Sequence, residues 1–173
     1  QSERCRDILA ELSRSPDEDE TFRSTNLTGL VEAAVEPYGQ YGIELEVIAA
    51  DGTPPTVPRS PEVMHGLANI TENAVDFAEE KVQIFLEWSG PEITVRIEDD
   101  GPGIPDDVLR SLGEPYMTTR RESGGMGLGV FIATTLLERS GARVEYTNRR
   151  RLGGRIVGAA VVIRWPNGMI EGN

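Results

Sequence analysis

The chain has 173 residues, of which 17 are Lys or Arg and 29 are Asp or Glu, so its formal net charge is −12. The length suits one folded domain with a short appendage, and the acidic balance argues against a protein that coats nucleic acid through bulk charge. The single histidine and the single cysteine exclude an internal disulfide framework and a zinc site built from several histidines. No apolar run approaches the roughly 20 residues that a membrane-spanning helix needs.

The beginning of the chain has its own pattern. Cys5, Ile8 and Leu12 recur at helical spacing, and the segment SPDEDE that follows interrupts the helix with a proline and a run of acids. A first helix packed on the main domain is one interpretation. The other, which we adopt, divides the chain into a helix of a neighbouring unit over 1–14, a linker over 15–24, a folded domain over 25–167 and a tail over 168–173.

Helices and strands alternate along the predicted domain. Apolar spacing and helix-start signals predict helices over 27–38, from 61 to about 80 and over 127–141, with one helical turn at 105–111. Apolar alternation and apolar runs predict strands over 42–49, 82–88, 92–99, 143–148 and 156–165, and the proline-rich segment 51–61 is expected to form turns. This order predicts an α+β two-layer sandwich with a mixed, mostly antiparallel sheet and helices on one face.

One helix of this domain carries an unusual polar stripe. His65, Asn69 and Asn73 recur four residues apart, with Glu72 and Asp76 beside them. Asparagine and aspartate disfavour helix interiors, because their side chains compete for backbone hydrogen bonds. A solvated helix face is one explanation. The other is a Mg²⁺ site, since amide and carboxylate oxygens suit a hard cation that also holds phosphates.

Two glycine-rich segments follow. The turn EDDGPGI (98–104) comes directly after a predicted strand, where Asp99 can accept a hydrogen bond from an amine such as that of adenine. The segment GGMGLG (124–129) leads into a helix, whose first backbone N–H groups favour phosphate. Taken alone, the first segment is equally typical of an acidic turn, and the second is equally typical of a flexible hinge. Their order after the polar helix, at intervals of about 26 residues, favours a nucleotide site.

Together these motifs resemble the ATP-binding domain of sensor histidine kinases, within the wider group of gyrase, the Hsp90 chaperones and the MutL repair proteins. NITENAVDFA (69–78) resembles the N box, DDGPGI the first glycine box, EPYMTTR (114–120) the F box and GGMGLG the second glycine box. The resemblance implies a Bergerat-type fold with a lid over about 113–127. It implies Mg²⁺ on Asn73, and nucleotide contacts from Asn69, Asn73, Asp76, Asp99, Gly101, Gly103, Tyr116, Gly125, Gly127, Leu128 and Gly129.

The resemblance also implies a reaction. A glutamate that activates water normally stands at the position of Asn69 in the hydrolysing members, and asparagine is no such base. Phosphoryl transfer from ATP to a histidine on a dimerisation hairpin is therefore favoured, with relay to a response regulator. The only histidine, His65, lies on the nucleotide-binding helix, so the acceptor is expected outside this chain. Residues 1–14 would be the tail of the hairpin's second helix, and the chain alone is expected to bind ATP without autophosphorylating.

The resemblance extends to a subgroup. CRDILAELS near the start and the ending GA…IRWP are similar to the redox-responding RegB/PrrB/ActS kinases of proteobacteria, in which a cysteine of this region acts as a redox switch. Cys5 stands at a comparable place, although an inert apolar position explains it equally well. The implied setting is the cytoplasmic part of a dimeric inner-membrane sensor, attached to the membrane only through a missing N-terminal part and binding no nucleic acid.

Three alternatives stay open at this point. The first is an ATPase of the gyrase and Hsp90 kind, which Asn69 argues against. The second is a serine kinase of similar fold that acts on an anti-sigma partner, and the third is a degenerate binding module that has lost ATP.

Overall fold

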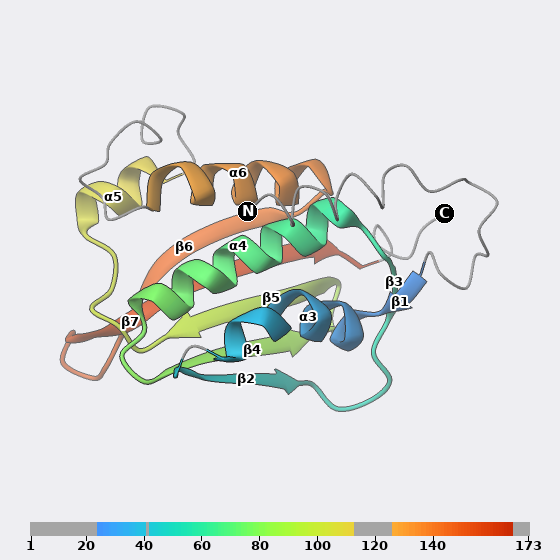
Figure 1. The fold of residues 1–173 in the computed structure, drawn as a ribbon, viewed down its shortest axis with the longest axis horizontal. Helices are drawn as coiled ribbons and strands as arrows, with labels where there is room; N and C mark the ends of the chain where they lie inside the picture. The colour runs from blue at the N-terminus through green and yellow to red at the C-terminus, as the bar shows by residue number, and fades with distance from the viewer. Residues whose placement is uncertain (1–23, 41, 113–125, 168–173) are drawn as a thin grey trace.

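The computed structural model describes residues 24–40, 42–112 and 126–167 (Figure 1). The predicted helix over 1–14, the linker that follows it, the tail over 168–173 and Cys5 lie outside the described residues, apart from Ser24 at the end of the linker. These predictions therefore stay predictions.

The described elements follow the predicted order closely. In chain order they are β1 (Ser24–Asn26), α3 (Leu27–Val35), the 3-10 helix η1 (Glu36–Gln40), β2 (Glu44–Ala49), β3 (Thr56–Pro58), α4 (Pro61–Phe77), β4 (Lys81–Glu87), β5 (Glu92–Asp99), α5 (Asp106–Ser111), α6 (Met126–Arg139), β6 (Arg143–Arg150) and β7 (Ile156–Pro166).

Both N-terminal helix starts are capped by local side chains. Asn26 accepts a hydrogen bond from the N–H of Gly29 at 2.7 Å at the start of α3, and Ser60 accepts one from the N–H of Val63 at 3.3 Å at the start of α4. Pro61 occupies the first position of α4, where its missing N–H removes no helical bond. These caps explain why the chain turns into helices at these residues.

Helix α4 ends earlier than the sequence predicts. It stops at Phe77 rather than near residue 80, and Ala78 is extended with ψ of 146°. The next backbone N–H groups, from residues 79–81, donate to the carboxylate of Asp100 instead of to helical carbonyls. A contact between distant residues therefore sets this helix end.

Five strands form one sheet in the order β2-β4-β5-β7-β6. The predicted hairpin is confirmed, because β4 and β5 pair antiparallel, and the β2–β4 pair is parallel, which makes the sheet mixed. The prediction of turns alone over 51–61 is wrong in one respect, since β3 pairs with β1 in a separate two-stranded sheet. Val57 at the centre of β3 is only 1% exposed, so its burial anchors this short strand.

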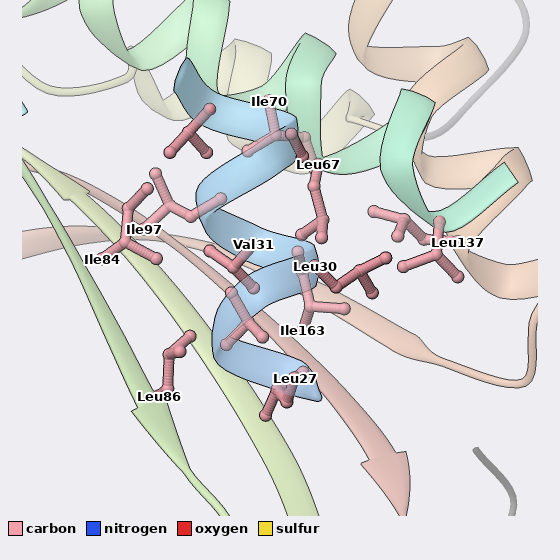
Figure 2. Packing of buried hydrophobic residues seen from close by; sticks show 14 of the residues in the cluster. Leu27, Leu30, Val31, Leu67, Ile70, Ile84, Leu86, Ile97, Leu137 and Ile163 are labelled. Carbon is pink, nitrogen blue, oxygen red and sulfur yellow. The ribbon is translucent and has the colours of Figure 1, made fainter. Parts of the chain in front are cut away.

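Helices α3, α4 and α6 lie on one face of the large sheet (Figure 1). Alternate residues of the central strands point toward them and form the core with the helices, as Figure 2 shows for Ile84, Leu86 and Ile97 against Leu30, Val31 and Leu67. The predicted two-layer α+β sandwich with helices on one face is confirmed. Among the described helices, none has the length and apolarity that a bilayer crossing requires.

Candidate nucleotide-binding site

A pocket lies where the last turns of α4, the end of β5, the start of α6 and strands β6 and β7 meet. Three predicted site residues line it, namely Asn73 from α4, Asp99 from β5 and Gly103 from the turn after β5. Most other lining side chains are apolar: Ile70, Ala74, Phe77, Ile97, Ile104, Val130, Ala159 and Val161. The pocket therefore has apolar walls with few polar groups, which is typical of a site for a small organic ligand.

Asp99 is the buried acid of this pocket. It is 7% exposed, and its Oδ1 accepts hydrogen bonds from the N–H of Gly101 at 2.9 Å and of Ala159 at 3.2 Å. Within the described residues its Oδ2 accepts none. Burial raises the pKa of the Asp99 carboxyl, and the two backbone hydrogen bonds oppose that rise in part. A buried carboxylate with one oxygen available is suited to accept a hydrogen bond from a ligand.

The two glycines of the turn have different structural reasons. A Cβ on Gly101 would lie 2.2 Å from the carbonyl oxygen of Phe77, so the turn packs directly against the end of α4. Gly103 has φ of +85°, and its Cβ would lie 2.5 Å from a methyl group of Ile156. Gly103 lines the pocket, whereas Gly101 does not. The structure thus gives Gly101 a packing role in bringing the turn close to α4.

The polar stripe of α4 is only partly directed to the pocket. Asn73 lines it, whereas Asn69 and Asp76 do not. Asp76 is exposed, and burial together with the nearby charge of Glu72 raises the pKa of its carboxyl. In the described part of the chain, no three His, Cys, Asp or Glu side chains gather as a metal site would require.

The second glycine segment begins α6. The helix starts at Met126, so Gly127, Leu128 and Gly129 stand in its first turn rather than in a loop. Leu128 is 58% exposed, and outside the helix itself no atom of the described residues lies within 4 Å of the place where a Cβ on Gly129 would stand. The first N–H groups of a helix have no intrahelical partner, so this end can hold an anion. Gly125, Tyr116 and most of the predicted lid lie outside the described residues.

Tyr146 is a pocket residue that the sequence reasoning missed. It stands on β6, and its hydroxyl is hydrogen bonded to the Thr134 hydroxyl on α6, which itself donates to the carbonyl oxygen of Val130. Burial raises the pKa of Tyr146 to about 12, so the phenol stays neutral. The alternation of Val144, Tyr146 and Asn148 along β6 is the signal that could have placed it on the inner face.

Comparisons with known proteins agree with this architecture. Residues 59–168 match the family described as histidine kinase-, DNA gyrase B-, and HSP90-like ATPase. The chain is 39% identical to the sensor histidine kinase RegB of Cereibacter sphaeroides, over 96% of this chain and 40% of that protein. It is 31% identical to the sensor histidine kinase GtrS of Pseudomonas aeruginosa, over 83% of this chain and 30% of that protein.

The fold is similar to that of a solved structure as well. The mycobacterial sensor histidine kinase MprB superposes with a TM-score of 0.67 at 22% identity, over 83% of this chain and 95% of that one. The predicted fold and the resemblance to the RegB group are therefore confirmed. The chain spans about 40% of the length of the RegB relatives that it matches.

Proposed function

This chain belongs to the family of histidine kinase-, DNA gyrase B- and HSP90-like ATPases, and we propose that residues 25–167 are the catalytic domain of a sensor histidine kinase. In this proposal the domain binds ATP and transfers its γ-phosphoryl group to a histidine on a dimerisation hairpin. The hairpin belongs to the same dimeric protein, and residues 1–14 are its final turns. The phosphoryl group then passes to a response regulator.

The observation that carries the proposal is the buried carboxylate of Asp99. Its Oδ1 is held by two backbone N–H groups, and its Oδ2 accepts no hydrogen bond from the described residues. The exocyclic amine of adenine donates hydrogen bonds, so it is matched to that oxygen, and the apolar walls of the pocket suit the faces of the ring. Gly103 lines the pocket beside Asp99, and its left-handed φ of +85° is the conformation that glycine adopts most readily.

The residues present fit Mg²⁺ held jointly with phosphates better than a metal held by protein alone. The described residues offer no three-residue carboxylate or imidazole cluster, but the Asn73 side chain brings an amide oxygen to the pocket. Mg²⁺ usually takes one or two protein oxygens and completes its shell with phosphates and water. In this proposal Asn73 holds the ion, which would neutralise phosphate charge, while the first turn of α6 contributes backbone N–H groups from Gly127 to Gly129.

Transfer is favoured over hydrolysis by the residues near the pocket. Asn69 stands on α4 outside the pocket lining, and an amide does not accept a proton from water at neutral pH. His65 lies on the same helix, two turns before Asn73, so we infer that the phosphoryl acceptor is a different histidine. Positioning of ATP and neutralisation of its charge are then the domain's main contributions to the reaction.

Calorimetry of Mg-ATP binding to this chain tests the proposal. We expect the parent to bind, and we expect Asp99→Asn to weaken binding at least about tenfold, because the amide offers the adenine amine a donor or a weaker acceptor. Asp51→Asn removes the same charge from an exposed turn and should leave the affinity unchanged. A parent without affinity for ATP would contradict the proposal. If the parent binds ATP, a second assay supplies the dimerisation hairpin as a separate protein. Phosphorylation of its histidine, rather than of a serine, would distinguish the histidine kinase from its serine kinase rival.

A further inference from the structure

The turn Asp99–Ile104 carries the acid and the glycine that line the pocket, so its position determines the shape of the base site. Two consecutive residues of β6, Asn148 and Arg149, contact opposite ends of this turn. Neither of them lines the pocket itself. Nothing in the motifs of the sequence assigns them a role.

Asn148 holds the last residue of the turn. Its Oδ1 accepts from the N–H of Ile104 at 2.7 Å, and its Nδ2 donates to the carbonyl oxygen of Ile104 at 2.8 Å. One side-chain amide thus satisfies both backbone groups of a residue that is 5% exposed. Gly103, directly before it, has the left-handed φ of +85°, and Asn148 Oδ1 would lie 2.9 Å from a Cβ there. The amide therefore fixes the backbone where it enters the pocket.

Arg149 holds the first residue of the turn from the other face of the sheet, because neighbouring strand residues point in opposite directions. Its Nη1 donates to the carbonyl oxygen of Asp99 at 2.6 Å, and its Nε pairs with Glu98 Oε1 at 2.8 Å. The Arg149 side chain is 27% exposed and that of Glu98 is 13% exposed, so the pair is largely shielded from water. Arg96 pairs with the second carboxylate oxygen of Glu98 and completes the network.

The neighbouring strand leaves space for this arrangement. A Cβ on Gly158 of β7 would lie 1.9 Å from the Asp99 carbonyl oxygen, so a side chain there is incompatible with the observed backbone. The next residue of β7, Ala159, donates its N–H to the Asp99 carboxylate. Strands β6 and β7 together therefore hold both the backbone and the side chain of Asp99.

We propose that Asn148 and Arg149 form a clasp on the Asp99–Ile104 turn and are positioning residues for recognition of the nucleotide base. The inference rests on the proposed function, because it assigns the clasp to the ATP site. The clasp acts through Asp99 and Gly103 rather than through contact with the ligand. Selectivity for adenine depends on where Asp99 presents its Oδ2. Loosening the clasp should therefore reduce this selectivity more than it reduces the affinity for the triphosphate, which ATP and GTP have in common.

The test measures binding of Mg-ATP and Mg-GTP to the full chain and to single variants by calorimetry. Asn148→Ala should weaken ATP binding about tenfold and reduce the preference for ATP over GTP several-fold, since it leaves two buried backbone groups without partners. Arg149→Lys keeps the charge but lacks the guanidinium fork that reaches Asp99 and Glu98 together, so a smaller loss of the same kind is expected. Arg151→Gln removes a positive charge from an exposed position two residues along and is the matched control.

The outcomes separate the two proposals. A parent that binds no ATP overturns the proposed function and the clasp with it. A parent that prefers ATP, with Asn148→Ala folded and equally selective, overturns the clasp alone. Hydrogen exchange of the Ile104 amide in the nucleotide-free chain gives a second readout. It compares the parent with Asn148→Ala, or with Arg149→Lys if Asn148→Ala does not fold. Protection in the parent that falls at least about tenfold in the variant supports the clasp, and unchanged protection overturns it.

Discussion

The two ends of the candidate site are held in different ways. At the Asp99–Ile104 turn, the backbone and the acid are bonded to the α4–β4 connection, to β6 and to β7. At the start of α6, by contrast, Leu128 is mostly exposed, and no described residue outside the helix lies within 4 Å of the Cβ position of Gly129. The difference indicates that contacts within the protein hold the Asp99–Ile104 turn, the proposed base end, without any ligand. In the proposed site, the start of α6 instead offers backbone N–H groups whose partner would be the phosphates of the ligand.

The largest expected effect comes from disturbing the base end by one methyl group. In Gly101→Ala, the new Cβ would stand 2.2 Å from the Phe77 carbonyl oxygen, and backbone on both sides must move. We expect the free energy of unfolding to fall by about 2–3 kcal/mol, as for other overpacked sites. Chemical denaturation measures the loss. Gly90→Ala is the control, because apart from its chain neighbours no described residue lies within 4 Å of the Cβ position there. Equal stability of the two variants would contradict the packing role.

A smaller effect is expected from the carboxylate that ties this turn to the end of α4. Burial alone would raise the pKa of Asp100, but hydrogen bonds from the N–H groups of Glu80, Lys81 and Glu79 outweigh it and lower the pKa. Asp100→Asn should reduce the free energy of unfolding by about 1–2 kcal/mol at neutral pH, because hydrogen bonds to a charged acceptor are the stronger ones.

The pH dependence of the Asp100 effect has a defined sign. The folded pKa lies below the unfolded one, so the stabilisation is complete above the ordinary carboxyl range and is lost as pH falls through the folded pKa. Denaturation curves of the parent and Asp100→Asn should therefore converge in acid. Asp51→Asn serves as the control, and a stability gap that persists at low pH would show that the carboxylate charge is not responsible.

The smallest effect is expected at the phosphate end. Gly129 lies in the first turn of α6, and no described residue outside the helix lies near its Cβ position. Gly129→Ala should therefore raise the free energy of unfolding by about 0.5–1 kcal/mol through helix propensity. This change in the free energy of unfolding has the opposite sign to the change expected for Gly101→Ala. Thermal unfolding without nucleotide measures it, and a clear loss of stability would mean that the two ends are held alike.

The sequence predicted those parts of the site whose signals are local. Asn73, Asp99 and Gly103 belong to motifs in which residue type and spacing point to their chemistry, and the structure brings all three to one pocket. The resemblance to the N box implied nucleotide contacts from Asn69 and Asp76 as well. They do not line the pocket, because a stripe of five polar residues covers a wider arc of α4 than the pocket contacts.

The parts that escaped prediction depend on contacts between distant residues. Asn148 meets Ile104 across 44 positions of the chain, and no local pattern encodes that pairing. Tyr146 follows ordinary strand alternation, so only knowledge that β6 lies beside β7 assigns it to the pocket. The short strand β3 was missed because its prolines favour turns, whereas burial of Val57 in the tertiary structure overrides that preference.

The hydrogen bond from Ala159 to Asp99 also constrains how the site comes into being during synthesis. The two residues are 60 positions apart, and β7 is the final described strand. A nascent chain that has already released α4 and β5 from the ribosome still lacks the strand that fixes the acid. Such long-range strand pairing forms late and slowly compared with local helices. The Asp99 pocket is thus among the last features of the domain to form, because its acid is fixed only once β7 has paired.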